Sequence, residues 1–309
     1  MISLTTSLGY SQVTTDHQIY LADPAIFQDK GTYYLYGTVE GNASEGFKVY
    51  TSKDQKSWTD RGFALKKPDA FGDKGFWAPQ VFTHGKSKIM AYVANENIAL
   101  ATSSSALGPF RQEVLKPLSA PVKQIDPYLY FDEDGKIYLY HVRLQEGNRI
   151  FVAEMKPDLS EMIAGTLREC VHAETGWENT NQAKWPVAEG PTIIKRKGTY
   201  YLFYSANDFR NPDYAVGFAT SKHPLGPWEK YAGNPILSKN DIHQNGTGHG
   251  DFYKDQKGQL HYVFHTHHSN TTVAKRKTAT IPLQFVSKAG SFDIPVFDFS
   301  NFRFLNTTP

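Results

Sequence analysis

The sequence has little of what several classes of protein need. It contains one cysteine, Cys170, so no disulfide can form within the chain. With 33 Lys and Arg against 31 Asp and Glu, its charge gives no reason to expect nucleic acid or a membrane surface as a partner. No apolar run approaches the roughly 20 residues of a membrane-spanning helix. We therefore expect neither a disulfide-stabilised fold nor a membrane protein.

The N-terminal segment also lacks a recognisable targeting signal. Residues 1–18 show no basic stretch followed by an apolar stretch, which a secretory signal peptide requires. A secreted or periplasmic location would then require a leader that had already been removed. A cytoplasmic location is the alternative.

Aromatic residues, by contrast, are abundant. They make up 14% of the sequence, with 18 Tyr and 20 Phe against only 4 Met, and this balance favours strands over helices. One pattern occurs three times: an acidic residue opens an apolar strand, and a Gly-containing turn leads into a second, Tyr-rich strand. The three copies open at Asp23-Pro24, Asp126-Pro127 and Glu189-Gly190-Pro191.

Two further units without an opening acid complete the series. The five units start near residues 23, 77, 126, 189 and 249, and each contains about four short strands. Repeats of this size with several strands each are typical of a β-propeller. We predict an all-β fold, a five-bladed β-propeller in which each blade is a four-stranded antiparallel sheet. A single domain would cover residues 1–309.

The propeller geometry would bring the three repeated acids together. The innermost strand of each blade lines the central channel, so equivalent positions converge on the axis. Asp23, Asp126 and Glu189 would then surround one pocket. A single Asp-Pro pair is more often a turn, but three acids in phase favour a shared site. Two carboxyl groups that flank a glycosidic bond can hydrolyse it, and a third can raise the pKa of the proton donor.

With these motifs the chain resembles glycoside hydrolase family 43, whose five-bladed propellers remove arabinose or xylose units from plant polysaccharides. The resemblance spans roughly residues 20–285. It implies that Asp23 is the general base and Glu189 the general acid. Asp126 would adjust the pKa and the orientation of that acid. The resemblance also implies inversion of the anomeric carbon.

Other motifs fit the same family. Phe76-Trp77-Ala78-Pro79 resembles its Trp-Ala-Pro segment, which implies that Phe76 and Trp77 border the sugar, although aromatic residues at a strand start are equally typical of a core. Gly246-Thr247-Gly248-His249-Gly250 resembles its Gly-His motif. That motif implies that His249 lies in the channel near a cation, frequently Ca²⁺, bound directly or through water.

Two basic or imidazole clusters near the C-terminus are harder to interpret. Arg276 resembles the late arginine of the family, which contacts substrate hydroxyls or the acid cluster, but Lys275-Arg276-Lys277 is equally typical of a solvated edge. The histidines of residues 265–268 are expected to be loop or pocket-wall residues and not a zinc site.

We expect an inverting, exo-acting enzyme that removes terminal pentose units from oligo- or polysaccharides. An α-L-arabinofuranosidase is the first choice, and a β-xylosidase or a related exo-glycosidase acting on galactan or arabinan is the alternative. Substrate choice would come from blade loops, such as those at residues 40–46, 174–185 and 207–213. Nothing in the sequence indicates an organic cofactor or an oligomeric state.

Two rival interpretations differ in class. Residues 52–58 resemble the Asp box of sialidase propellers, but they are one residue short and occur once. The arginine cluster and the Tyr–Glu pair of a sialidase cannot be assembled from this chain. A non-catalytic carbohydrate-binding propeller is the second rival, and the complete set of three acids favours an enzyme over it.

Overall fold

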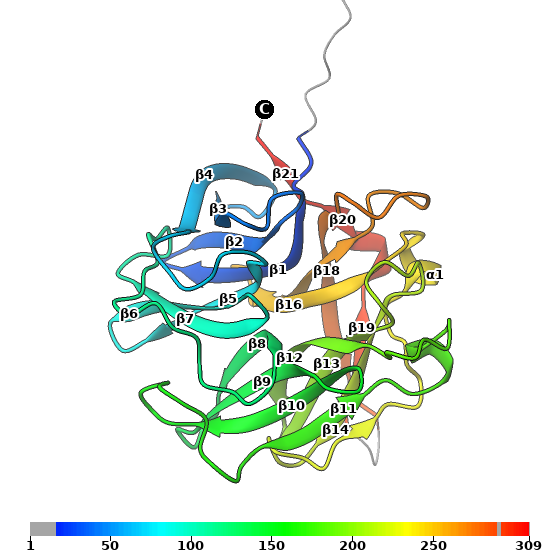
Figure 1. Cartoon of the computed structure of the whole chain (residues 1–309). Coiled ribbons are helices and arrows are strands. Elements are labelled where there is room, and N and C mark those ends of the chain that lie inside the picture. Colours follow the sequence, from blue (N-terminus) through cyan, green and yellow to red (C-terminus); the bar gives the residue numbers. More distant parts are fainter. Residues whose placement is uncertain (1–16, 289–291, 309) are drawn as a thin grey trace, which may run out of the picture.

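The protein is described by a computed structural model that places residues 17–288 and 292–308. Its strands form five small sheets arranged as the blades of a propeller, as predicted (Figure 1). The first blade contains β1 (Leu21–Asp29), β2 (Thr32–Val39), β3 (Gly46–Ser52) and β4 (Ser57–Lys66). The second contains β5 (Trp77–His84), β6 (Ser87–Ala94) and β7 (Asn97–Ser103). The third contains β8 (Gln124–Phe131), β9 (Ile137–Leu144), β10 (Asn148–Met155) and β11 (Arg168–His172).

The last two blades complete the ring. The fourth contains β12 (Ala188–Arg196), β13 (Thr199–Ala206), β14 (Ala215–Ser221) and β15 (Glu229–Lys230). The fifth contains β16 (Gly248–Lys254), β17 (Leu260–Thr266), β18 (Lys277–Val286) and β19 (Ile294–Phe297), with β20 (Arg303–Phe304) paired to β18. The helical segments are short: η1 (Gly176–Glu178), α1 (Lys239–Ile242) and η2 (Phe299–Asn301). None of the helices in the placed residues could span a membrane.

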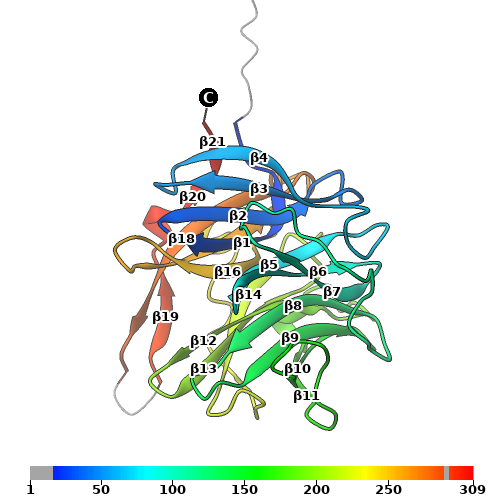
Figure 2. The same ribbon diagram turned by 90° about the vertical axis from the view of Figure 1, so that its left-hand side faces the viewer.

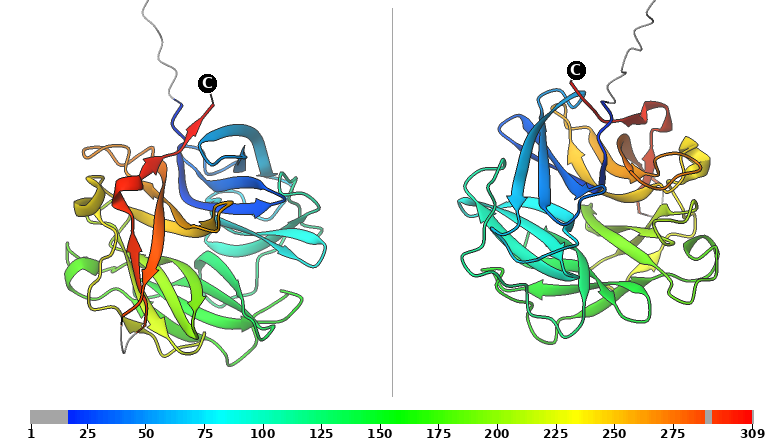
Figure 3. Two further views of the ribbon diagram at one scale, coloured as in Figure 1. Left: turned by 180° about the vertical axis from the view of Figure 1, so that it is seen from behind. Right: turned by 45° about the horizontal axis from the view of Figure 1, so that its top comes forward.

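The two ends of the described chain meet between the first and the fifth blade. Strand β21 (Asn306–Thr307) runs parallel to β4 and extends the first blade (Figure 2). The backbone N–H of Ile19 donates to the carbonyl of Leu305 at 2.9 Å, and that of Thr278 donates to Ile19 at 3.0 Å. Segments from both ends of the sequence therefore close the ring (Figure 3).

The second blade departs from the four strands expected. Its sheet has three strands within the described residues, and the next segment makes one isolated bridge, Thr102 to Arg111. Beside this bridge, the backbone N–H of Phe110 donates at 2.7 Å to the carbonyl of Ala64 in the first blade.

The core is divided among the blade interfaces. Five buried apolar clusters join residues of neighbouring blades, four of them from two blades and one from three. Aromatic rings fill much of this space, for example Phe47, Phe76 and Tyr92, which pack with centroids 5.7 to 6.0 Å apart between the first and second blades. The high Tyr and Phe content thus packs the wedge-shaped space between twisted sheets.

Candidate active site

All five inner strands carry the same irregularity near their first residues. The pairing register slips at Ala22/Ala25, Trp77/Gln80, Ile125/Tyr128, Glu189/Thr192 and Gly248/Asp251. At each slip one residue has a positive φ between 45° and 61°: Asp23, Ala78, Asp126, Gly190 and His249. A bulge of this kind re-aims side chains and is often found beside an active site. Here it is repeated in every blade around the channel.

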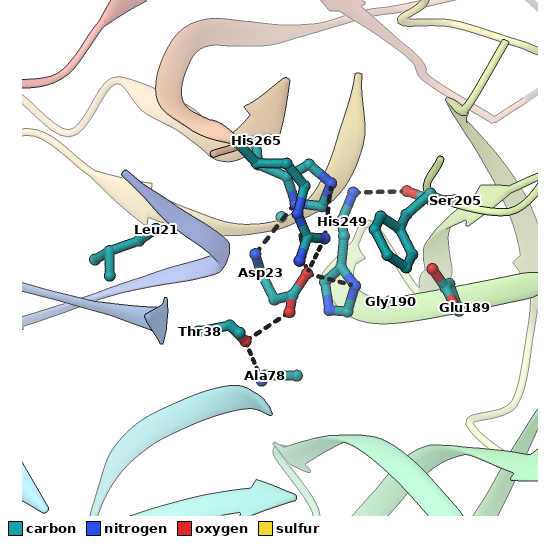
Figure 4. A network of polar contacts seen from close by, with 12 residues as sticks. Leu21, Asp23, Thr38, Ala78, Glu189, Gly190, Ser205, His249 and His265 are labelled. Atoms are coloured by element: carbon teal, nitrogen blue, oxygen red, sulfur yellow. Dashed lines mark hydrogen bonds and ion pairs between the residues drawn. The ribbon is translucent and has the colours of Figure 1, made fainter. Parts of the chain in front are cut away.

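The three acids were expected at equivalent positions of their blades, but the bulges show that Glu189 is displaced by one residue. Asp23 and Asp126 occupy the left-handed position, but in the fourth blade that position is held by Gly190. Glu189 comes one residue earlier, where the second blade has Trp77. Successive side chains of a strand point in different directions. Glu189 therefore stands apart from the hydrogen-bonded cluster around Asp23 (Figure 4).

Gly190 is favoured at its position mainly by the close approach of His249, since the other four bulges accept a side chain at a similar φ. Its φ is +61°, and a Cβ atom there would lie 2.9 Å from Cγ of His249. The backbone N–H of Gly190 also donates to Oδ2 of Asp126 at 3.0 Å. The glycine thus lets the His249 ring and the Asp126 carboxyl group approach the same stretch of backbone.

Asp23 is surrounded by donors and positive charge. Thr38 Oγ1 donates to its Oδ2 at 2.6 Å, and Nη1 of Arg276 and Nδ1 of His249 each lie 3.4 Å from its Oδ1. Its backbone N–H donates to Nδ1 of His265 at 3.1 Å. Burial raises the pKa of Asp23, but the charges of His249 and Arg276 outweigh this effect and the pKa falls to about 2. Asp23 is thus suited to stay ionised and to accept a proton.

The other two acids are shifted the opposite way. Burial, followed by the charge of Asp23, raises the pKa of Asp126 to about 8. Burial, followed by the charge of Asp126, raises the pKa of Glu189 to about 7. Neighbouring carboxyl groups with pKa values pushed apart are the pattern by which a site separates acid from base.

Glu189 accepts two hydrogen bonds. The Tyr214 hydroxyl donates to Oε1 and the Asn148 amide donates to Oε2, both at 2.9 Å. The Glu189 side chain is 8% exposed, so little of it other than its carboxyl edge is reachable from solvent. These contacts fix the orientation of the carboxyl group toward the pocket.

A pocket of about 460 Å³ lies over the three acids. Its lining comes from all five blades and includes Asp23, Trp77, Asp126, Asn148, Trp185, Glu189, Phe209, His249 and Arg276. Of Phe76 and Trp77, both expected to border the sugar, only Trp77 lines this pocket. Placing Phe76 at the sugar was wrong, because its ring is fully buried against Phe47 and Tyr92.

Arg276 lies at the site and not at a solvated edge. It is 9% exposed, its Nε donates to Glu40 Oε1 at 2.7 Å, and its guanidinium stacks on Phe209 with 4.4 Å between the guanidinium carbon and the ring centroid. With Asp23 also beside it, Arg276 holds the acid cluster together.

Several residues of the site were not singled out from the sequence, although Glu40, Trp185 and Phe209 lie in blade loops that were expected to set substrate choice. The full set comprises Thr38, Glu40, Asn148, Trp185, Phe209 and Tyr214, which belong to loops or to second and third strands. His265, expected on the pocket wall, lies fully buried behind Asp23 and stacks on Tyr214. Burial and then the charge of Arg276 hold the pKa of His265 well below its usual value.

The cation expected near His249 has few protein ligands available. No group of three or more His, Cys, Asp or Glu side chains could hold a metal ion within residues 17–288 and 292–308. Below the acids, a cavity of about 30 Å³ is lined by Asp23, Asp126, His249 and Asp251. These residues suit a cation with one imidazole ligand and a shell completed by water, and not one enclosed by protein ligands.

Comparison with known proteins places the chain among carbohydrate-active relatives. The model of the Glycosyl hydrolases family 43 matches residues 17–288. A solved structure described as an endo-1,4-beta-xylanase of Bacteroides thetaiotaomicron VPI-5482 is 37% identical, covers 96% of this chain and 99% of its own, and superposes with a TM-score of 0.88.

More distant relatives differ in activity. A beta-D-galactofuranosidase of Aspergillus niger is 24% identical, with 90% of this chain and 82% of its own length covered. The extracellular exo-alpha-(1->5)-L-arabinofuranosidase ArbA of Cellvibrio japonicus is 24% identical, with 81% of this chain and 80% of its own length covered.

Proposed function

The chain belongs to glycosyl hydrolase family 43 and is therefore a glycoside hydrolase of an inverting family. We propose that it is exo-acting and removes a terminal L-arabinofuranosyl unit from plant oligo- or polysaccharides. The observation that carries this proposal is the pocket of about 460 Å³ over Asp23, Asp126 and Glu189. Residues of all five blades line it, which suits a terminal sugar, whereas an internal cleavage site needs a groove open at both ends.

In the proposed mechanism Asp23 and Glu189 act on opposite sides of the sugar. Asp23, ionised because of His249, Arg276 and its hydrogen bond from Thr38, takes a proton from a water molecule as the water attacks the anomeric carbon. Glu189 gives its proton to the glycosidic oxygen as the carbon–oxygen bond breaks. The released sugar carries the water oxygen in the inverted configuration. Asp126, held by the Gly190 N–H, orients the acid and adjusts its pKa.

The choice of sugar rests on the relatives. ArbA is described as an exo-acting arabinofuranosidase, which supports that activity here. A β-xylosidase is the second candidate, and a relative described as a xylan 1,3-beta-xylosidase supports it. The structure described as an endo-1,4-beta-xylanase also suggests xylan, but its name implies internal cleavage, which the product analysis below tests. The same comparison with ArbA supports a secreted or periplasmic location, which we also propose.

We further propose a cation, with calcium first, beside His249. Its role would be electrostatic, because it would offset part of the charge of the buried acids. The proposal is supported by the cavity below the acids and by the Asp251 carboxyl group that lines it. Proton donor and base are supplied by the acids, so the ion would act through its charge and not as a Lewis acid on the sugar.

The test combines substrates with two variants. Wild-type protein is assayed on 4-nitrophenyl arabinofuranoside, xyloside and galactoside, and the products from branched arabinan are followed with time. We expect free arabinose first and no early oligosaccharides. Asp23→Asn should abolish turnover of all substrates. Glu189→Gln should lose activity on arabinan while retaining much of it on activated aryl glycosides, which need little protonation.

Several results would overturn parts of the proposal. Oligosaccharides as the first products would show internal cleavage. Xylose release with no arabinose release would favour the β-xylosidase. Binding of arabino-oligosaccharides with no hydrolysis by the wild type would instead support a non-catalytic carbohydrate-binding propeller.

A further inference from the structure

A continuous hydrogen-bonded path leads from the pocket rim to Glu189. Asn148, the first residue of β10, lies in the middle of this path. Its Nδ2 donates to Glu189 Oε2 at 2.9 Å, and its Oδ1 accepts a hydrogen bond from Nε1 of Trp185, also at 2.9 Å. Trp185 is 50% exposed, whereas Glu189 is 8% exposed. An aromatic surface that solvent can reach is thus connected to a buried acid through one amide.

The backbone around this path is built for close approach. The N–H of Asn148 donates to the carbonyl of Pro186 at 2.9 Å, and Asn148 also forms a parallel bridge with Val187. Gly147 has a φ of +121°, and a Cβ atom on it would lie 2.5 Å from the Pro186 oxygen. Glycine therefore allows the third blade to contact the segment that leads into β12. This contact sets Trp185 and Asn148 beside each other.

The donors and acceptors of this path can be assigned in only one way. An indole N–H can only donate, so the Asn148 amide must present its oxygen to Trp185. The NH₂ group is then left to face Glu189, and an NH₂ group cannot accept a proton. The proton of Glu189 is consequently not shared with Asn148 and stays available to the pocket. An amide turned the other way would accept that proton and hold it.

We propose that Trp185 forms a leaving-group subsite and, through Asn148, positions the proton of the general acid. The exposed indole face would stack on the sugar ring that departs, and the indole N–H would fix the amide. Contact with the leaving group and the position of the Glu189 proton would then both depend on Trp185. This inference rests on the proposed function, because it takes Glu189 as the general acid.

The central test is Trp185→Phe, which keeps an aromatic face and removes the N–H. The freed amide can turn its oxygen toward Glu189 and capture the proton. We expect KM for an arabino-oligosaccharide within about twofold of wild type, and kcat on this poor leaving group lower by roughly tenfold. Activity on an activated aryl glycoside should change by less than about twofold, because that substrate needs little protonation. The pH at which kcat/KM falls on the alkaline side should rise, because the pKa of Glu189 rises.

Three further variants separate the contributions. Trp185→Ala removes the stacking face as well, so KM for the oligosaccharide should rise roughly tenfold, whereas in Trp185→Phe it stays within about twofold. Asn148→Ala should shift the alkaline limb upward without the rise in KM, because it removes a donor to Glu189. Trp77→Phe is the matched control: it alters another pocket tryptophan and should leave the alkaline limb where it is.

The outcomes are distinguishable once melting temperatures confirm that each variant is folded. An unmoved alkaline limb in both Trp185→Phe and Asn148→Ala, or equal losses on both substrate classes, would overturn the subsite inference. Should Trp185→Phe fail to fold, Asn148→Ala alone decides the pH effect and Trp185→Ala the stacking. If Glu189→Gln retains full activity on the oligosaccharide, the proposed function itself fails. If Glu189→Gln loses that activity while Trp185→Phe behaves as wild type, only this inference fails.

Discussion

Together with His249, Arg276 lowers the pKa of Asp23 and with it the lower pH limit of the site, if Asp23 is the base. Its Nη1 lies 3.4 Å from Oδ1 of Asp23. A base works only when ionised, so activity is present above its pKa and is lost as the pH falls through it. The pKa of about 2 for Asp23 keeps the base ionised in moderately acidic solution. Arg276→Met removes a permanent positive charge and should move this limit upward.

The size of the effect follows from the charge and the distance. Two unit charges 3.4 Å apart attract by about 5 kcal/mol at an effective dielectric constant of about 20, which is an upper bound because the guanidinium spreads its charge. Pairs of this kind lower a carboxyl pKa by about 1 to 3 pH units. The acid limb of kcat/KM should therefore move from about pH 2 in the wild type to between roughly pH 3 and pH 5 in Arg276→Met.

The assay is the pH profile of kcat/KM on an activated aryl glycoside, with folding checked at each pH by circular dichroism. Arg276→Lys keeps the charge and should hold the limb lower than Arg276→Met does. Lys275→Met removes a charge from the exposed neighbour and should leave the limb unmoved. Because Arg276 also bonds Glu40, the melting temperature of Arg276→Met should fall. An acid limb at the wild-type position in folded Arg276→Met would refute the electrostatic role.

Three other predictions concern separate features of the site. Gly190→Ala should lower the free energy of unfolding by about 1–3 kcal/mol in urea titrations, because φ is +61° and the new Cβ would press on His249; an unchanged value would contradict this account. Tyr214→Phe removes a donor that favours the ionised form of Glu189, so the pKa of Glu189 should rise above about 7 and the alkaline limb of kcat/KM should move upward with it. A downward movement would contradict that role. Exhaustive chelation should lower both the melting temperature and kcat, and full retention of both in a verified metal-free sample would reject the proposed cation.

Much of the architecture was predictable because its causes are local. Alternating apolar residues, Gly-containing turns and abundant Tyr and Phe occur again in each unit, and each unit needs neighbours to bury its faces. Asp23, Asp126 and Glu189 could be picked out because each opens such a unit. The three-stranded sheet of the second blade, within the described residues, was not predicted.

What only the tertiary structure decided is the direction and environment of the side chains. The bulges place Asp23 and Gly190 in the left-handed region. The Glu-Gly-Pro spacing already shows that Glu189 precedes this position by one residue, but only the structure shows that its side chain stands apart from the cluster around Asp23. Phe76 and its neighbour Trp77 could not be distinguished in the sequence, whereas in the structure Phe76 is buried in the core and Trp77 lines the pocket. The shifted pKa values arise because burial and charges from different blades converge on the channel axis. Such convergence depends on contacts between residues far apart in the chain, which no local pattern encodes.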